Sequence, residues 1–429
     1  MTRPTALREA HAHLPAHGRE MGYLALGDCV DRGDALDRVA RHAADLDRRA
    51  EPGWLLASGL RPESWASAPG GAAWPTRDEL DRACPRRPCF VGAFDHHSCA
   101  LNSAALAASG FHDASPDPEG GVIARDARGR ATGVLLESAY GAARAAIPEP
   151  TRPQWKRFIK AAADHLASLG FVEVHDLLTP PGLGSILAEL HDEGALPVRV
   201  LLYRPWRELD DEVAAAGSYR RAGVDLAGGK LFADGTLNAA TAWMLHPYRE
   251  PVAGMLHGKP LAAPAELDEA LAACQARGLE LAVHAIGDAA VRATLDARAR
   301  RPAARLRIEH AELIDRADVP RFAELGVTCS VQPCHLLYDA EALRRRCPDR
   351  LDRVLPLREL IDSGCGPGGL LWFGSDTPIV RPDPGDSIAA AVQRRRAQGS
   401  PAGPACDPVA PEQAITEGEA WACFGGSEQ

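Results

Sequence analysis

Short apolar runs alternate with segments of helical period from residue 171 onward, and this alternation restricts the possible fold more than any other feature of the chain. The runs lie at 170–176, 197–203, 228–235, 279–288, 305–313, 326–333 and 370–378. Between several of them lie helical segments such as 264–278 and 316–326. Because buried strands joined by helical crossovers form parallel sheets, this pattern predicts an α/β fold with a parallel sheet.

An additional strand that ends at His11 brings the predicted number to eight, which is the number that closes a (β/α)8 barrel. No glycine-rich phosphate loop follows this first strand. We therefore favour a TIM-type barrel and keep an open doubly wound sheet as the alternative. The first strand contains Arg8 and Glu9, so we expect it to be short or strained.

The segment between the first two predicted strands is about 155 residues long, far more than a helical crossover requires. It has apolar runs of its own and a hairpin pattern over 120–138. We therefore predict four parts along the chain. They are a barrel start with the first strand and helix over 1–49, an inserted α+β subdomain over 50–150, the main barrel over 151–400, and a C-terminal loop and helix over 401–429.

Composition excludes several classes of protein. The 429 residues carry a net charge of −10, which disfavours general nucleic-acid binding, since that requires a basic face. The sequence has no apolar stretch of the ~18 residues that a membrane span needs. The 11 cysteines form no CxxC pair, which fits reduced thiols in the cytoplasm. We expect a cytoplasmic protein whose partner is a small molecule, not a nucleic acid or a membrane.

Most of the predicted strands end in a residue that can bind a metal or transfer a proton. His11 and His13 are two positions apart, so both side chains share one face of the first strand. Later strands end in Lys230, His284, His310 and Asp376. The carboxyl ends of barrel strands converge on one mouth, and imidazoles with a carboxylate suit Zn²⁺. Taken singly, each residue also has a structural explanation, such as a surface lysine, a core histidine or a helix cap.

Eight stretches of the chain carry a further signal. They are "EAHAHL", "DHHSCALNSAAL", "GRATGVLLE", "KLFADGTL", "AVHAIGDAAV", "RIEHAEL", "VQPCH" and "FGSDTP". In this order and spacing, the chain resembles the amidohydrolase superfamily, and within it the amidohydrolase family 3 branch, which includes N-substituted formamide deformylase-like enzymes.

This resemblance implies a metal centre and roles for particular residues. His11, His13 and Asp376 would hold one divalent metal, with zinc expected. Lys230, carboxylated by CO₂, would bridge to a second metal held by His284 and His310. The metals would activate a water as hydroxide, and Asp376 would shuttle its proton to the leaving nitrogen. Substrate contacts are expected from Asp95, His97, Asp234, Trp243 and His335.

The implied activity is hydrolysis of a C–N bond in a small amide or formamide. Alternatives are a mononuclear deaminase or cyclic-amide hydrolase of the same superfamily, or a non-catalytic barrel scaffold. No glutamate occurs in 285–288, directly after His284, which counts against deamination. Members of the branch carry a flanking β-sandwich, which we expect to be missing here. A second copy of the chain could cover that surface, which makes a homodimer a candidate assembly.

Overall fold

The computed structural model of the protein describes residues 4–65, 73–93, 98–118, 120–251, 255–398, 400 and 405–425. The chain divides into two compact units. One contains Met1–Gly18 and Ile159–Gln429 and is called the barrel unit here. The other contains Arg19–Phe158 and is called the second unit.

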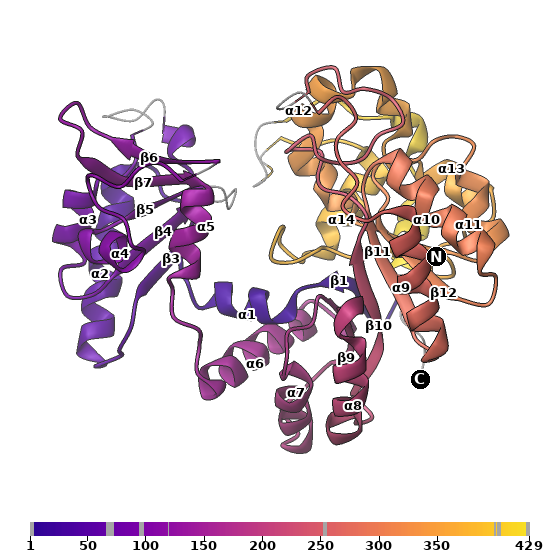
Figure 1. Ribbon diagram of the computed structural model, residues 1–429, viewed down its shortest axis with the longest axis horizontal. Coiled ribbons are helices and arrows are strands. Elements are labelled where there is room, and N and C mark those ends of the chain that lie inside the picture. Colours follow the sequence, from indigo (N-terminus) through magenta and orange to yellow (C-terminus); the bar gives the residue numbers. More distant parts are fainter. Residues whose placement is uncertain are drawn as a thin grey trace. The chain divides into compact units, whose positions relative to one another are not determined.

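The barrel unit is built on eight parallel strands whose order in the sheet is their order in the chain. They are β1 (Leu7–Ala12), β8 (Phe171–Leu177), β9 (Arg199–Pro205), β10 (Val224–Phe232), β11 (Glu280–Ala285), β12 (Arg305–His310), β13 (Thr328–Val331) and β14 (Leu371–Phe373). Strands β1, β9, β10, β11 and β12 are labelled in Figure 1. The two edge strands meet through a parallel bridge between Ala12 and Thr377. There Asp376 N–H donates to the His11 carbonyl at 2.7 Å, and His13 N–H donates to the Thr377 carbonyl at 2.8 Å. The sheet is thereby nearly closed, and the predicted TIM-type barrel is confirmed.

Helices follow most of the strands and pack on the outside of the sheet. They are α6 (Arg152–Ser168), α7 (Leu183–Asp192), α8 (Leu209–Tyr219), α9 (Pro264–Ala276), α10 (Asp288–Arg300), α11 (Val319–Leu325), α12 (Leu336–Arg346), α13 (Leu357–Asp362), α14 (Pro384–Gln393) and α15 (Glu417–Cys423). Helix α11 ends at Gly326, whose φ of 62° is a left-handed conformation that glycine adopts without steric cost. The helical segments predicted at 264–278 and 316–326 correspond to α9 and α11.

The pairing of β1 with β8 is irregular between Leu7 and Arg8 and between Glu9 and Ala12, but β1 is six residues long and fully buried, so it is not short. The reason is that both charged side chains find partners. The Arg8 guanidinium stacks on the Trp372 ring at 3.8 Å from its centroid. Glu9 Oε1 accepts hydrogen bonds from the backbone N–H groups of Ser375 at 2.8 Å and His11 at 3.1 Å. These contacts engage only part of each charged group, because Arg8 Nε, Arg8 Nη2 and Glu9 Oε2 are buried without a hydrogen-bond partner among the described residues.

The C-terminal segment belongs to the barrel unit. The Phe424 carbonyl accepts a hydrogen bond from Arg8 N–H at 2.7 Å, and Gly425 forms an antiparallel bridge with Leu7. The Phe424 ring packs against Phe171 and Phe373, at centroid distances of 6.0 and 5.6 Å. This end of the chain therefore stabilises the amino-terminal end of β1, opposite to His11.

The second unit contains a six-stranded mixed sheet with the order β2-β3-β4-β5-β7-β6. Its strands are β2 (Leu24–Ala25), β3 (Leu55–Leu60), β4 (Cys89–Ala93), β5 (Ser98–Leu101), β6 (Gly121–Arg125) and β7 (Ala131–Glu137). Its helices are α2 (Arg32–Arg48), α3 (Arg77–Ala83), α4 (Ser103–Ala108) and α5 (Ser138–Ala145), while α1 (Leu14–Met21) leads into it. The hairpin predicted over 120–138 is β6 and β7.

The second unit is wider than the insertion predicted over 50–150. Strand β2 pairs in parallel with β3, and α2 packs against α3, so residues 19–49 do not belong to the start of the barrel. Within the described ranges every strand belongs to one of the two sheets. No helix among the described residues of either unit is long and apolar enough to cross a membrane.

Candidate metal centre and active site

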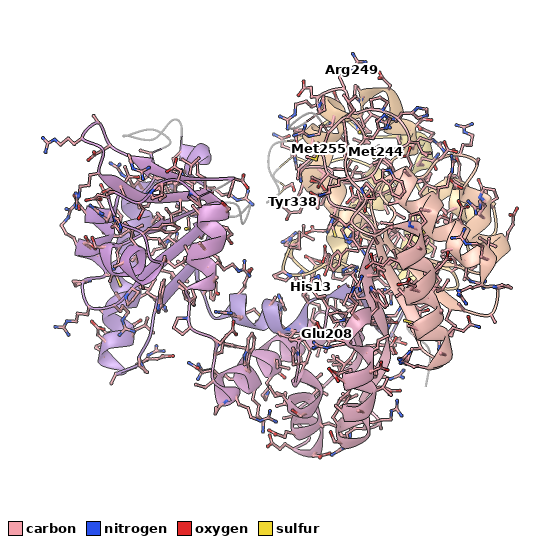
Figure 2. All side chains as sticks on the ribbon, viewed as in Figure 1. His13, Glu208, Met244, Arg249, Met255 and Tyr338 are labelled. Atoms are coloured by element: carbon pink, nitrogen blue, oxygen red, sulfur yellow. The ribbon has the colours of Figure 1, made fainter. Side chains whose placement is uncertain are left out.

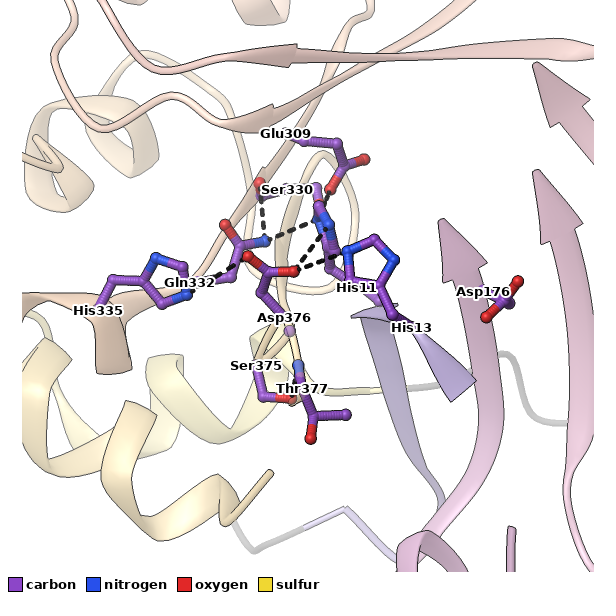
Figure 3. A network of polar contacts seen from close by, with 12 residues as sticks. His11, His13, Asp176, Glu309, Ser330, Gln332, His335, Ser375, Asp376 and Thr377 are labelled. Carbon is purple, nitrogen blue, oxygen red and sulfur yellow. Dashed lines mark hydrogen bonds and ion pairs between the residues drawn. The ribbon is translucent and has the colours of Figure 1, made fainter. Parts of the chain in front are cut away.

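Side chains from three separate strands meet at the carboxyl end of the barrel (Figure 3). His11 lies in β1, His310 is the last residue of β12, and Asp376 follows β14. Asp376 Oδ1 is 3.3 Å from His11 Nε2 and 3.0 Å from His13 Nε2. The rings of His11 and His310 have a centroid distance of 4.8 Å. Barrel closure thus brings together His11 and Asp376, which lie near opposite ends of the barrel sequence.

Two of these residues have strained backbone conformations. His310 has a φ of 70° and Asp376 a φ of 64°, in the left-handed region that non-glycine residues seldom adopt. Such conformations cost about 1–3 kcal/mol each and persist only where the surrounding structure enforces them. Here the two positions coincide with the ends of strands that carry the site.

The donor set fits a divalent metal. One donor atom from each of His11, His310 and Asp376 lies within 4.8 Å of the others. His310 Nδ1 and Lys230 Nζ are buried and have no hydrogen-bond partner among the described residues, while Asp376 Oδ1 lies against the imidazole nitrogens of His11 and His13. Buried polar atoms without a partner are costly, so this cluster calls for a bound group. Two imidazoles and a carboxylate are ligands that zinc and similar ions prefer.

Burial and neighbouring charges give these side chains the protonation states that metal ligands need. Burial lowers the pKa of His11 to about 4, and burial together with the His284 ring lowers the pKa of His310 well below its ordinary value. Burial raises the pKa of the Asp376 carboxyl. The interactions with His11 and His13 outweigh burial and keep this pKa below its usual range. The imidazoles are therefore neutral and the carboxylate is charged at neutral pH.

Lys230 and His284 lie beside this cluster. Lys230, in β10, is 2% exposed, and burial lowers its pKa to about 8. The ring of His284, in β11, is 4.5 Å from that of His310 between centroids. His284 Nε2 lies 3.0 Å from the Gly235 carbonyl oxygen, to which it can donate. That bond would leave Nδ1 as the nitrogen able to bind a metal.

A buried ionic network holds His11 in place. His11 Nδ1 is 2.7 Å from Glu309 Oε2, so Nδ1 carries the proton and Nε2 remains free on the side of Asp376. Glu309 in turn accepts from Arg307, and both side chains are fully buried. Arg307 also donates to His175 Nδ1 at 2.6 Å and to Ser330 Oγ at 3.0 Å. Sequence reasoning missed Glu309 and Arg307, although both stand within three residues of His310.

His335 lies on another side of Asp376, in the short 3₁₀ helix Pro333–His335. Its Nε2 is 3.7 Å from Asp376 Oδ2, and its Nδ1 is 3.7 Å from Glu312 Oε1. Burial favours the neutral ring, but the carboxylates of Glu312 and Asp376 outweigh burial and raise the pKa of His335 to about 9. In Figure 2, Tyr338 and Met244 lie beyond His13, on the segments that follow β13 and β10. The site is therefore on the side of the barrel where these long loops begin.

The other predicted substrate residues have different surroundings. Asp234 accepts hydrogen bonds from the backbone N–H groups of Trp243 at 2.8 Å, Ile286 at 3.0 Å and Gly287 at 2.8 Å. Asp234 thus joins the loop after β10 to the loop after β11, and Trp243 takes part through its backbone. Asp95 and His97 lie outside the described residues. A substrate contact by any of these four residues stays a prediction.

Comparison with known proteins identifies the family of the chain. Residues 6–427 match the family described as the amidohydrolase family. A putative amidohydrolase, YtcJ, from Bacillus subtilis is 28% identical over 402 residues, which cover 90% of this chain and 72% of that protein. The N-substituted formamide deformylase of Arthrobacter pascens is 25% identical over 376 residues, or 81% of this chain and 65% of that protein.

Solved structures give the same result. An uncharacterized metal-dependent hydrolase from Pyrococcus horikoshii superposes with a TM-score of 0.76 at 26% identity, covering 97% of this chain and 78% of that one. Because the family match spans nearly the whole sequence, the chain belongs to the amidohydrolase family. It is a metal-dependent hydrolase of the class that acts on carbon–nitrogen bonds other than peptide bonds.

Proposed function

We propose that this hydrolase cleaves the carbon–nitrogen bond of a small amide of the formamide type, with Asp376 as the proton carrier. The observation that carries the proposal is the position of Asp376, whose Oδ1 meets the imidazoles of His11 and His13 while Oδ2 faces His335. The similarity to an N-substituted formamide deformylase supports an amide of this type.

His11, His13 and Asp376 would hold a first divalent metal, and Lys230 in carboxylated form would reach a second one held by His284 and His310. A metal bound there supplies Lewis acidity and makes a water molecule acidic enough to deprotonate near neutral pH. Glu309 orients His11 by holding Nδ1–H, so that Nε2 stays available for coordination.

Asp376 is suited to carry a proton during the reaction. Its low pKa keeps the carboxylate charged before the attack on the carbonyl, so it can accept a proton from the attacking water. The nitrogen that leaves an amide needs a proton, because an amide anion is a very poor leaving group. Asp376 would therefore return the proton to that nitrogen, which completes hydrolysis to a carboxylic acid and an amine.

Release of amine from a panel of compounds tests this function. The zinc-loaded protein should release amine from at least one N-formyl or N-acyl amine, and a chelator should abolish that release. If folded, metal-loaded protein releases no amine from any compound in the panel but liberates ammonia from aminated rings, the deaminase alternative replaces the proposal.

Carboxylation of Lys230 is predicted to depend on pH, since only the neutral amine reacts with CO₂. With a pKa of about 8 in place of the ordinary value of about 10.4, the neutral fraction rises about five-fold between pH 7 and pH 8 and levels off above that. In ¹³C NMR with ¹³C-bicarbonate, a carbamate signal should grow over this range. Lys230→Arg should lose the signal and Lys259→Arg, at an exposed position, should keep it. An identical signal in both variants would contradict the assignment to Lys230.

A further inference from the structure

We infer that Asp176 is a positioning residue that holds His13 in the direction that metal binding requires. Asp176 lies one residue before the end of β8, and its side chain binds the backbone of the residue that follows His13. The inference rests on the proposed role of His13 as a metal ligand and adds what keeps this ligand in place.

His13 depends on its backbone for its orientation. Strand β1 ends one residue before it and α1 begins one residue after it, so His13 belongs to neither element. Its side chain is 24% exposed, whereas that of His11 is 1% exposed. Its ring meets Asp376, itself a proposed metal ligand, and the described residues include no counterpart of the Glu309 that holds His11. The direction of the His13 ring is therefore set mainly by the peptide groups on either side of it.

Asp176 fixes one of these two peptide groups. Its Oδ1 accepts a hydrogen bond from Leu14 N–H at 2.8 Å. Leu14 is the first residue of α1, and the first N–H groups of a helix have no partner within the helix. Asp176 thus acts on α1 as an N-cap side chain does, but from a neighbouring strand. The other peptide group is fixed because His13 N–H donates to the Thr377 carbonyl at 2.8 Å.

A second set of contacts holds Asp176 itself. Its Oδ2 accepts from Thr179 Oγ1 at 2.8 Å, and Tyr203 N–H in β9 donates to the same hydroxyl at 3.2 Å. Between Asp176 and Thr179 lies Leu178, whose φ of 118° is unfavourable for a residue other than glycine. The N–H groups of Leu178 and Thr179 both donate to the Tyr203 carbonyl, at 3.1 and 2.9 Å. This strained turn folds the chain back so that Thr179 reaches Asp176.

Asp176 is not suited to bind the metal directly. It is 1% exposed, both of its carboxyl oxygens have partners, and the groups of candidate metal ligands among the described residues leave it out. Figure 3 draws no contact between Asp176 and the histidines of the site. In the described part of the chain, no arginine or lysine forms an ion pair with it, so a salt bridge does not explain its burial. Its effect on the metal centre therefore passes through the backbone at His13.

Zinc affinity, measured by competition with a chelating dye, tests the inference without turnover. Asp176→Ala should weaken zinc binding about 10- to 100-fold, because His13 loses one of its two backbone anchors. Asp176→Asn keeps an oxygen that can accept from Leu14 N–H, and the Thr179 hydroxyl can accept from the amide, so its zinc affinity should stay close to native. Asp192→Ala, at an exposed position of α7, is the matched control and should bind zinc as the native protein does.

The visible absorption spectrum of the cobalt-substituted protein separates positioning from a loss of stability. Displacement of His13 changes the ligand field of the bound cobalt, so Asp176→Ala should shift or weaken these bands while circular dichroism shows a folded protein. Asp176→Asn and Asp192→Ala should keep the native spectrum. If Asp176→Ala does not fold, Thr179→Val, which removes the hydroxyl that holds Asp176, should cause a smaller shift of the same bands.

Two results would overturn the inference. One is native zinc affinity with an unchanged cobalt spectrum in folded Asp176→Ala. The other is an equal loss of affinity in Asp176→Ala and Asp176→Asn, since the hydrogen bond to Leu14 would then not be what matters.

His13→Ala separates this inference from the proposed function. If His13→Ala keeps both the zinc affinity and the cobalt spectrum, the proposed ligand role of His13 fails, and the role of Asp176 with it. If His13→Ala loses zinc affinity while folded Asp176→Ala does not, only the positioning role fails.

Discussion

Asp376→Asn is expected to lower kcat by about 100- to 10,000-fold while the protein stays folded and keeps most of its metal. The amide is nearly isosteric with the carboxylate and retains one oxygen on the side of His11 and His13. It cannot accept a proton and pass it on, so the step that protonates the leaving nitrogen should become slow. Steady-state rates on any amide that the native protein cleaves, combined with metal analysis, measure both effects.

Asp349→Asn is the matched control for this variant. Asp349 lies on the surface of the same unit and, among the described residues, forms an ion pair with the exposed Arg249 alone. Removing such a pair changes stability by at most about 1 kcal/mol and should leave kcat unchanged. Near-native turnover in Asp376→Asn would mean that another group carries the proton.

Arg307→Ala is expected to lower the free energy of unfolding by about 3–5 kcal/mol. Arg307 is fully buried and is the partner of Glu309, so its removal leaves a buried carboxylate without a counter-charge. Urea denaturation followed by tryptophan fluorescence measures the loss. Arg249→Ala, which breaks an exposed ion pair, should cost no more than about 1 kcal/mol.

The double variant Arg307→Met with Glu309→Met separates stability from function. Replacing both charges with apolar side chains should recover much of the lost stability, since no charge is then left buried alone. It should still weaken metal binding, because His11 loses the carboxylate that fixes its tautomer. If the double variant bound zinc as tightly as the native protein, Glu309 would have no role in orienting His11.

The barrel could be predicted because its signal is local and repeated. Each later strand is a short buried run followed by a helix, and a parallel arrangement follows from the length of the connections. The ends of these runs also identified His310 and Asp376, which the structure places together with His11. Strand periodicity and the convergence of strand ends in a barrel were sufficient to predict the barrel and the grouping of His310 and Asp376 with His11.

Glu309 could not be predicted in the same way. Adjacent strand residues alternate between faces, so Glu309 and His310 would be expected on opposite sides of β12. The left-handed backbone at His310 breaks this alternation, and both side chains contact His11. A local conformation that only the assembled site enforces leaves little trace in the sequence.

The boundary of the second unit was missed for a different reason. Helix α2, at Arg32–Arg48, has the amphipathic pattern of a barrel helix, and nothing in its own sequence shows which sheet it covers. Its assignment depends on β2, a strand of two residues that is too short to be recognised by periodicity. Tertiary pairing, not local pattern, decides where this helix belongs.

The central claim is that His11, His13, His310 and Asp376 form a metal centre, and elemental analysis of the purified protein tests it most directly. For protein produced with zinc and bicarbonate, we expect about one to two divalent ions per chain, reduced by at least about one in a folded His11→Ala variant. A well-folded native protein that retains no metal, or a His11→Ala variant with unchanged metal content, would contradict the claim.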